Sequence, residues 1–152
     1  MKKHFLLFTA LILFASWLQA QVVVNSDITG STTWTSNNIY LLQGGCLYVR
    51  NDATLTIEPG TIIKGDEAAL IILPGSKIIA DGTPERPIVF TSNQPAGLRA
   101  RGDWGGLTLL GKAPINVVGG TATVEGGCTE AVYGGTDAAD NSGILRYVRI
   151  EF

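Results

Sequence analysis

One short segment of the chain gathers side chains that could bind an acidic sugar. Residues 92–106, SNQPAGLRARGDWGG, carry Arg99, Arg101, Asp103 and Trp104. The arginines could pair with sugar carboxylates while the indole stacks on a sugar ring. In the alternative interpretation, which we favour, Asp103 caps the turn, Trp104 packs on the flank of the fold, and the arginines are solvated. We keep the four residues as candidates for glycan binding.

A second, glycine-rich segment carries oxygen ligands of the kind that calcium prefers. It spans residues 118–142, and its polar members include Glu125, Glu130, Asp137, Asp140 and Asn141. Asp137 and Asp140 are the metal candidates, and Ca²⁺ is the one cofactor that these residues suggest. Their spacing differs from that of an EF-hand loop. Acidic residues in such a loop are more often solvated turn formers, which is the interpretation we favour.

The sequence offers no complete set of catalytic residues. Its only histidine, His4, lies in the expected export segment, so the mature chain can form no Ser-His-Asp or Cys-His arrangement. Hydrolysis of a glycan needs two carboxylates across the scissile bond, and elimination from a uronate needs a basic side chain. Suitable residue types occur in both segments, but no spacing assigns them to one site. A polysaccharide lyase or glycoside hydrolase is therefore the alternative, and we expect no catalytic activity.

The only two cysteines, Cys46 and Cys128, lie 82 residues apart. In an exported protein they could form a disulfide. The sequence does not show whether they lie close enough for one, so two unpaired thiols are an equal expectation.

The elements that must position these segments are short apolar strands separated by tight turns. Six triplets recur before the first segment: Leu47–Val49, Leu55–Ile57, Ile62–Lys64, Leu70–Ile72, Lys77–Ile79 and Ile88–Phe90. Taken three at a time they nearly repeat, because Leu47 to Leu70 is 23 residues, Leu55 to Lys77 is 22 and Ile62 to Ile88 is 26. This three-strand period predicts an all-β solenoid. An antiparallel meander, the alternative, has no reason to repeat in this way.

Two Pro-Gly pairs support the solenoid. Glu58–Thr61 and Leu73–Ser76 have proline and glycine at the central positions of a type II turn, which predicts corners between strands. The expected organisation is an N-terminal lead-in or cap over residues 21–46, followed by coils over residues 47–152. The two segments at 92–106 and 118–142 are expected as loop insertions. Trp34, in the lead-in, is expected to cover the end of the core rather than stack on a sugar.

Residues 1–20 are typical of a signal peptide. Lys2 and Lys3 precede an apolar stretch, Phe5–Leu18, that is too short to span a membrane, and Leu18-Gln19-Ala20 is a cleavage site. We expect a secreted or cell-surface protein that meets the membrane only through this export signal. Without residues 1–20, 9 basic residues face 13 acidic ones, a formal charge of −4. No basic patch is present, so nucleic acid is not an expected partner.

Several motifs together resemble those of a protein family. They are Trp34 with Tyr40–Leu42, Leu55–Gly65, Pro87–Ser92, Arg101–Leu107, Leu110–Asn116, Tyr133–Gly143 and Leu145–Phe152. In this order they resemble secreted bacterial right-handed parallel β-helix proteins of the pectin-lyase-like type. The resemblance implies a surface protein of Bacteroidetes-type bacteria, whose relatives often carry a sorting domain for type IX secretion.

The expected fold is therefore a right-handed parallel β-helix that is incomplete at its C-terminus. Tyr147, Val148, Ile150 and Phe152 form an apolar strand that nothing after it would cover, which suggests an N-terminal fragment. The expected function is structural or adhesive, with a polysaccharide or cell-surface glycan as the partner.

Overall fold

The computed structural model describes residues 19–152, and within this range every regular element is a strand. The strands are β1 (Ala20–Val24), β2 (Thr32–Trp34), β3 (Asn38–Leu42), β4 (Cys46–Val49), β5 (Thr54–Ile57), β6 (Ile62–Gly65), β7 (Ala69–Ile72), β8 (Lys77–Asp81), β9 (Ile88–Ser92), β10 (Gly106–Leu109), β11 (Ala122–Thr123), β12 (Val132–Tyr133), β13 (Gly143–Arg146) and β14 (Val148–Ile150). The signal peptide expected at residues 1–20 lies almost entirely outside the described residues. A search of the described part found no helix long and apolar enough to cross a membrane.

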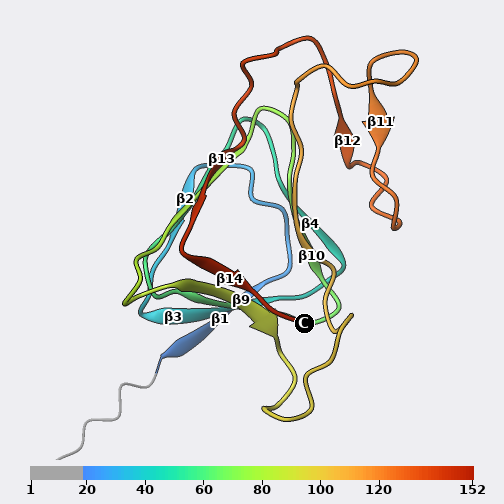
Figure 1. Cartoon of the computed structure of the whole chain (residues 1–152). Coiled ribbons are helices and arrows are strands. Elements are labelled where there is room, and N and C mark those ends of the chain that lie inside the picture. Colours follow the sequence, from blue (N-terminus) through green and yellow to red (C-terminus); the bar gives the residue numbers. More distant parts are fainter. Residues whose placement is uncertain (1–18) are drawn as a thin grey trace, which may run out of the picture.

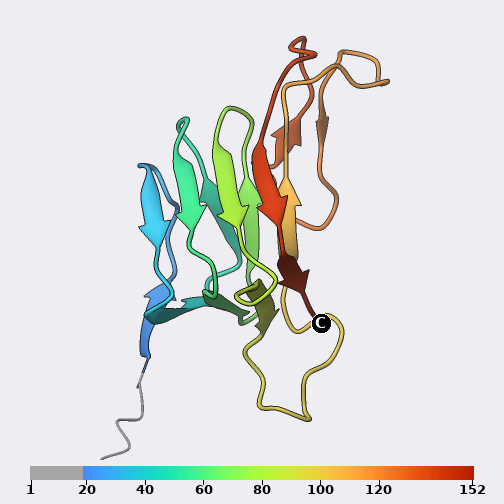
Figure 2. The same ribbon diagram turned by 60° about the vertical axis from the view of Figure 1, so that its left-hand side comes forward.

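Three parallel sheets enclose a core of triangular cross-section (Figure 1). The first sheet has the order β1-β3-β6-β9-β14, the second β4-β7-β10 and the third β2-β5-β8-β13. From β3 to β10 consecutive strands fall on consecutive sheets, so the chain completes one coil with every three strands, and the coils stack along one axis (Figure 2). The predicted all-β, right-handed parallel β-helix is confirmed.

The register between coils follows the side chains that point inward. Leu47 pairs with Leu70, 23 residues on, as the period predicted. Leu55 pairs with Ile78, and Ile62 pairs with Val89, each one residue later than the triplet starts suggested. This shift has a simple cause, because it places fully buried Leu55 above fully buried Ile78 and leaves Lys77 exposed.

The corners expected from the Pro-Gly pairs are present. The amide of Thr61 donates to the carbonyl of Glu58 over 3.2 Å, and that of Ser76 donates to the carbonyl of Leu73 over 3.0 Å. Gly60 and Gly75 have φ of +85° and +94°, as the third position of a type II turn requires.

Residues 20–42 lie in the coil stack rather than ahead of it. β1 pairs with β3, and β2 pairs with β5, both in parallel. This first coil does not show as a repeat in the sequence, because on the side of the second sheet it has no strand and makes only a single bridge, between Ile28 and Val49 of β4. Trp34 is 3% exposed and stacks on Tyr40 of β3, in the next coil, with 4.7 Å between ring centroids, so it has no free face for a sugar.

Two long connections leave the stack, both in the fourth coil. Residues 93–105 join β9 to β10, close to the expected insertion. Residues 110–142 join β10 to β13 and begin eight residues before the expected start at 118. This second connection contains an antiparallel pair, β11 with β12, which stands out beside the stack (Figures 1 and 2). We call residues 110–142 the side lobe.

Candidate functional site

The side lobe packs on an outer face of the stack that is itself apolar. Tyr48 on β4 and Ile71 on β7 point away from the main core, and they are 7% and 2% exposed. They form a second apolar cluster with Leu110 and Ala131 of the lobe. This cover explains why β4 and β7 are buried on both faces, whereas the third sheet alternates between buried and partly exposed positions along β5.

A disulfide ties the lobe to the second coil. Cys46, at the start of β4, is bonded to Cys128 between β11 and β12, with 5.8 Å between the Cα atoms. Of the two expectations that the sequence left open, the structure has the paired one. The bond flanks the second apolar cluster, so a covalent link and an apolar contact hold the lobe at the same place.

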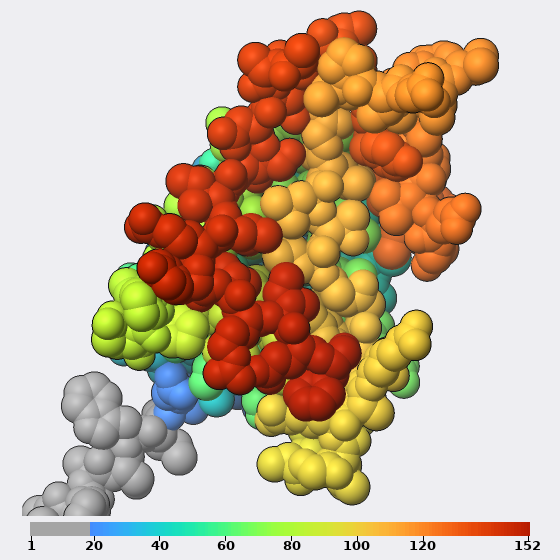
Figure 3. Space-filling view, in the orientation of Figure 1, coloured from blue at the N-terminus to red at the C-terminus, as the bar shows by residue number. Residues whose placement is uncertain are grey.

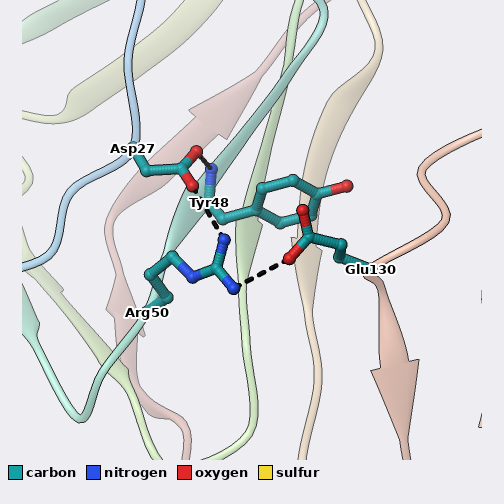
Figure 4. A network of polar contacts seen from close by, with 4 residues as sticks. All are labelled: Asp27, Tyr48, Arg50 and Glu130. Carbon is teal, nitrogen blue, oxygen red and sulfur yellow. Dashed lines mark hydrogen bonds and ion pairs between the residues drawn. The ribbon is translucent and has the colours of Figure 1, made fainter.

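A polar network forms the third attachment (Figure 4). The Arg50 guanidinium donates to Asp27 of the first coil over 3.1 Å and to Glu130 of the lobe over 2.7 Å. Asp27 also accepts a hydrogen bond from the amide of Tyr48 over 3.0 Å. The hydrogen bonds to Asp27 and to Glu130 raise the pKa of Arg50, so this arginine stays charged and bridges two carboxylates. Figure 4 shows Arg50 between them, beside the ring of Tyr48.

These attachments hold the lobe so that a cleft of about 530 Å³ opens between it and the fourth coil. The coil contributes Leu109, and the lobe contributes Leu110, Ala122, Thr123, Val124, Glu125 and Tyr133. In the space-filling view the lobe stands out from the stack at the upper right (Figure 3). The volume lies within the range of about 300–1,000 Å³ that is typical of small-molecule sites. Four of the seven lining residues are aliphatic, and the other three bring one phenol, one hydroxyl and one carboxylate, so the lining is almost evenly polar and apolar.

In the other connection, Asp103 and Trp104 hold the loop in place. Asp103 accepts hydrogen bonds from the hydroxyl of Ser92 and from the amide of Ala100, the latter over 2.9 Å. These two bonds, that of Ser92 first, hold the pKa of the Asp103 carboxyl below its ordinary value, against a smaller opposing effect of burial. Trp104 is 7% exposed, lies parallel to Phe90 and donates from Nε1 to the carbonyl of Glu151 over 3.0 Å.

The indole of Trp104 is thus part of the core, and it cannot stack on a sugar as the binding interpretation required. It lies against Gly65 at the end of β6, where a Cβ atom would come within 2.4 Å of the Trp104 Cβ. Arg99 is also engaged, because its Nε donates to the carbonyl of Gln94 over 3.0 Å. Arg101 is exposed, and it alone of the four candidates presents its charged group freely to solvent.

The two metal candidates make hydrogen bonds to backbone amides within the lobe. Asp140 accepts a hydrogen bond from the amide of Lys112 over 2.8 Å, and Asp137 accepts one from the amide of Ala139 over 3.0 Å. In the described residues, 19–152, no three or more His, Cys, Asp or Glu side chains gather as they would around a metal ion. The contact within Asp137–Ala139 is that of a turn, whereas the contact of Asp140 joins the two ends of the lobe; calcium binding by either residue stays a prediction.

Almost the whole described chain matches a known protein family. The sequence profile of the pectate-lyase-like beta helix domain matches residues 26–152. The chain belongs to this family. The match covers every strand from β2 to β14, including the side lobe, so the lobe lies within the family's domain. Comparison with curated proteins and with solved structures gave no significant match.

The cleft did not follow from the sequence. Of its lining residues only Glu125 was a candidate, and then as an oxygen ligand of a metal ion. A usable signal was nevertheless present, because the triplets Leu47–Val49 and Leu70–Ile72 are apolar at every position. Continuous apolar strands indicate burial on both faces, and hence a cover over the outer face of that sheet.

Proposed function

We propose that this pectate-lyase-like beta helix protein is exported and acts at the cell surface as a structural or adhesive element that binds glycan. The export signal at residues 1–20 supports the location. The resemblance of its motifs to secreted β-helix proteins supports a type IX-secreted protein of Bacteroidetes-type bacteria. Coils of parallel strands make a stiff rod, because each coil is bonded to the next along all three sides.

The observation that carries the glycan-binding proposal is the cleft beside the fourth coil. A disulfide, a bridging arginine and an apolar cluster fix the lobe in one position, so the cleft is held open before a ligand arrives. Preorganisation of this kind lowers the cost of binding. An aromatic side chain, Tyr133, and polar groups on Thr123 and Glu125 border an otherwise apolar lining, which suits a ligand with both apolar faces and hydroxyl groups.

A polysaccharide lyase or glycoside hydrolase is the second candidate, and the family match is what favours it. A fold supports many activities, so the match alone does not assign one. In the cleft, Glu125 is the single carboxylate among the lining residues, whereas hydrolysis uses a pair.

The test is a binding measurement with three single variants of the exported chain. Thr123→Ala alters the cleft, and Val132→Ala, directly across the β11–β12 pair, is its matched control outside the cleft. Arg101→Ala probes the other loop. Calorimetric titration against soluble oligosaccharides is expected to show binding that is weakened several-fold by Thr123→Ala only. Loss of binding in Arg101→Ala alone would move the site to residues 93–105. Appearance of new reducing ends or unsaturated uronates would favour the enzyme.

A further inference from the structure

The charge of the cleft points to a class of ligand that differs from the one suggested by the family's description. Of the seven described residues that line the cleft, Glu125 is the one that carries a charge. Its side chain is exposed at the border of the cleft, so the one formal charge that the lining offers a ligand is negative. The inference drawn from this rests on the proposed function and names the glycan class of that same site.

We propose that the cleft binds neutral glycan and discriminates against polyuronates. A carboxylate accepts hydrogen bonds from sugar hydroxyls at both of its oxygens, whereas a second carboxylate on the sugar would be repelled. Thr123 adds a hydroxyl that can donate as well as accept. A neutral sugar satisfies these groups without any countercharge.

The apolar lining supports the same ligand class. Leu109 from the fourth coil and Leu110 and Val124 from the lobe give the cleft surfaces that suit the carbon-bound hydrogens of a sugar ring. Tyr133 packs against the second apolar cluster, which fixes its ring, and also borders the cleft. Aromatic and apolar surfaces bind sugar faces without reference to charge, so they add affinity for neutral and acidic sugars alike. Glu125 is therefore the lining residue that distinguishes neutral from acidic sugars.

The charge of the surrounding chain acts in the same direction. Beyond residue 20 the formal charge is −4, so an acidic polymer approaches a protein of like sign. The exposed cation of Arg101 lies in the loop of residues 93–105, which projects from a different part of the stack (Figure 1). It is therefore not available to neutralise a uronate in the cleft.

The experiment pairs sugars that differ in one group. Neutral trisaccharides are titrated beside counterparts of the same linkage in which each hydroxymethyl group is a carboxylate. At low salt the neutral member is expected to bind about fivefold more tightly, from one like-charge contact at roughly 4 Å in water. In Glu125→Gln, a substitution at an exposed position, the ratio of the affinity for the neutral sugar to that for the acidic sugar is expected to fall below about twofold. Thr123→Ala is expected to weaken the binding of the neutral and the acidic sugar equally.

Each outcome bears on a different part of the proposal. Equal or tighter binding of the acidic member at the cleft, detected as amide shifts at Thr123 and Glu125, overturns the neutral preference but keeps the proposed function. Tighter acidic binding that is lost in Arg101→Ala places a polyuronate site in the other loop and removes the cleft from the function. Failure of every sugar in both series to bind overturns the proposed function together with this inference.

Discussion

Replacing Trp104 by alanine is expected to destabilise the fold rather than to affect a binding surface. The indole is 7% exposed and lies parallel to Phe90, with 6.2 Å between ring centroids. Truncation of a buried tryptophan costs about 3–5 kcal/mol, and loss of the Nε1 bond to Glu151 adds about 1 kcal/mol. The two losses sum to about 4–6 kcal/mol; we take the lower end, about 4 kcal/mol, which is a large part of the roughly 5–15 kcal/mol that stabilises a typical domain. With a urea slope of about 2 kcal/mol/M, the unfolding midpoint falls by about 2 M.

The assay is urea unfolding followed by circular dichroism, because the remaining tryptophans complicate fluorescence. Leu98→Ala is the matched control, since this side chain belongs to the same loop but is 69% exposed. Its midpoint is expected to shift by less than about 0.3 M. A Trp104→Ala midpoint as close to wild type as that of Leu98→Ala would refute the assignment of the indole to the core. It would restore Trp104 as a candidate for sugar stacking.

Two further predictions concern the lobe and the loop. Cys128→Ala should remove about 2–4 kcal/mol of stability, and amide hydrogen exchange should rise in residues 122–133 more than in the other strands. Cys46→Ala should have the same two effects. A smaller effect of either variant would contradict the conclusion that the disulfide holds the lobe in place. Because the folded Asp103 carboxyl has a pKa below its ordinary value of 3.8, its contribution to stability is complete above that value and is lost as pH falls through the lowered pKa. The difference in melting temperature between wild type and Asp103→Asn should therefore be largest at neutral pH and shrink as the pH falls below 3.8; a difference independent of pH would contradict it.

Strands and corners could be predicted from the sequence because their causes are local. An inward leucine recurs where a coil is complete, and proline with glycine fixes the turn at Gly60 and Gly75. The first coil escaped prediction, because one of its three sides is only a single bridge at Ile28. Its strands, β1 and β2, are recognised as part of the stack only because they pair with β3 and β5.

The candidate site could not be predicted, because it depends on contacts between distant segments. The Cys46–Cys128 bond and the Arg50–Glu130 pair join residues 82 and 80 positions apart. Neither follows from spacing. Trp104 was recognised in the sequence, but its role could not be assigned, because an aromatic side chain beside arginines fits both a glycan-binding surface and a core. The contacts of the indole with Phe90, with the carbonyl of Glu151 and with Gly65, which leaves room for it, distinguish the two.

The covalent link between the second coil and the side lobe also changes how the protein responds to force. A stack of coils that touch only their neighbours peels apart one coil at a time when its ends are pulled. Here Cys46 and Cys128 lie 82 positions apart, and at roughly 3.4 Å per residue the segment that they close would otherwise add about 280 Å to the extended chain. While the disulfide is intact, the segment between the two cysteines cannot extend. Most of coils two to four can therefore unfold without lengthening the chain between its two ends.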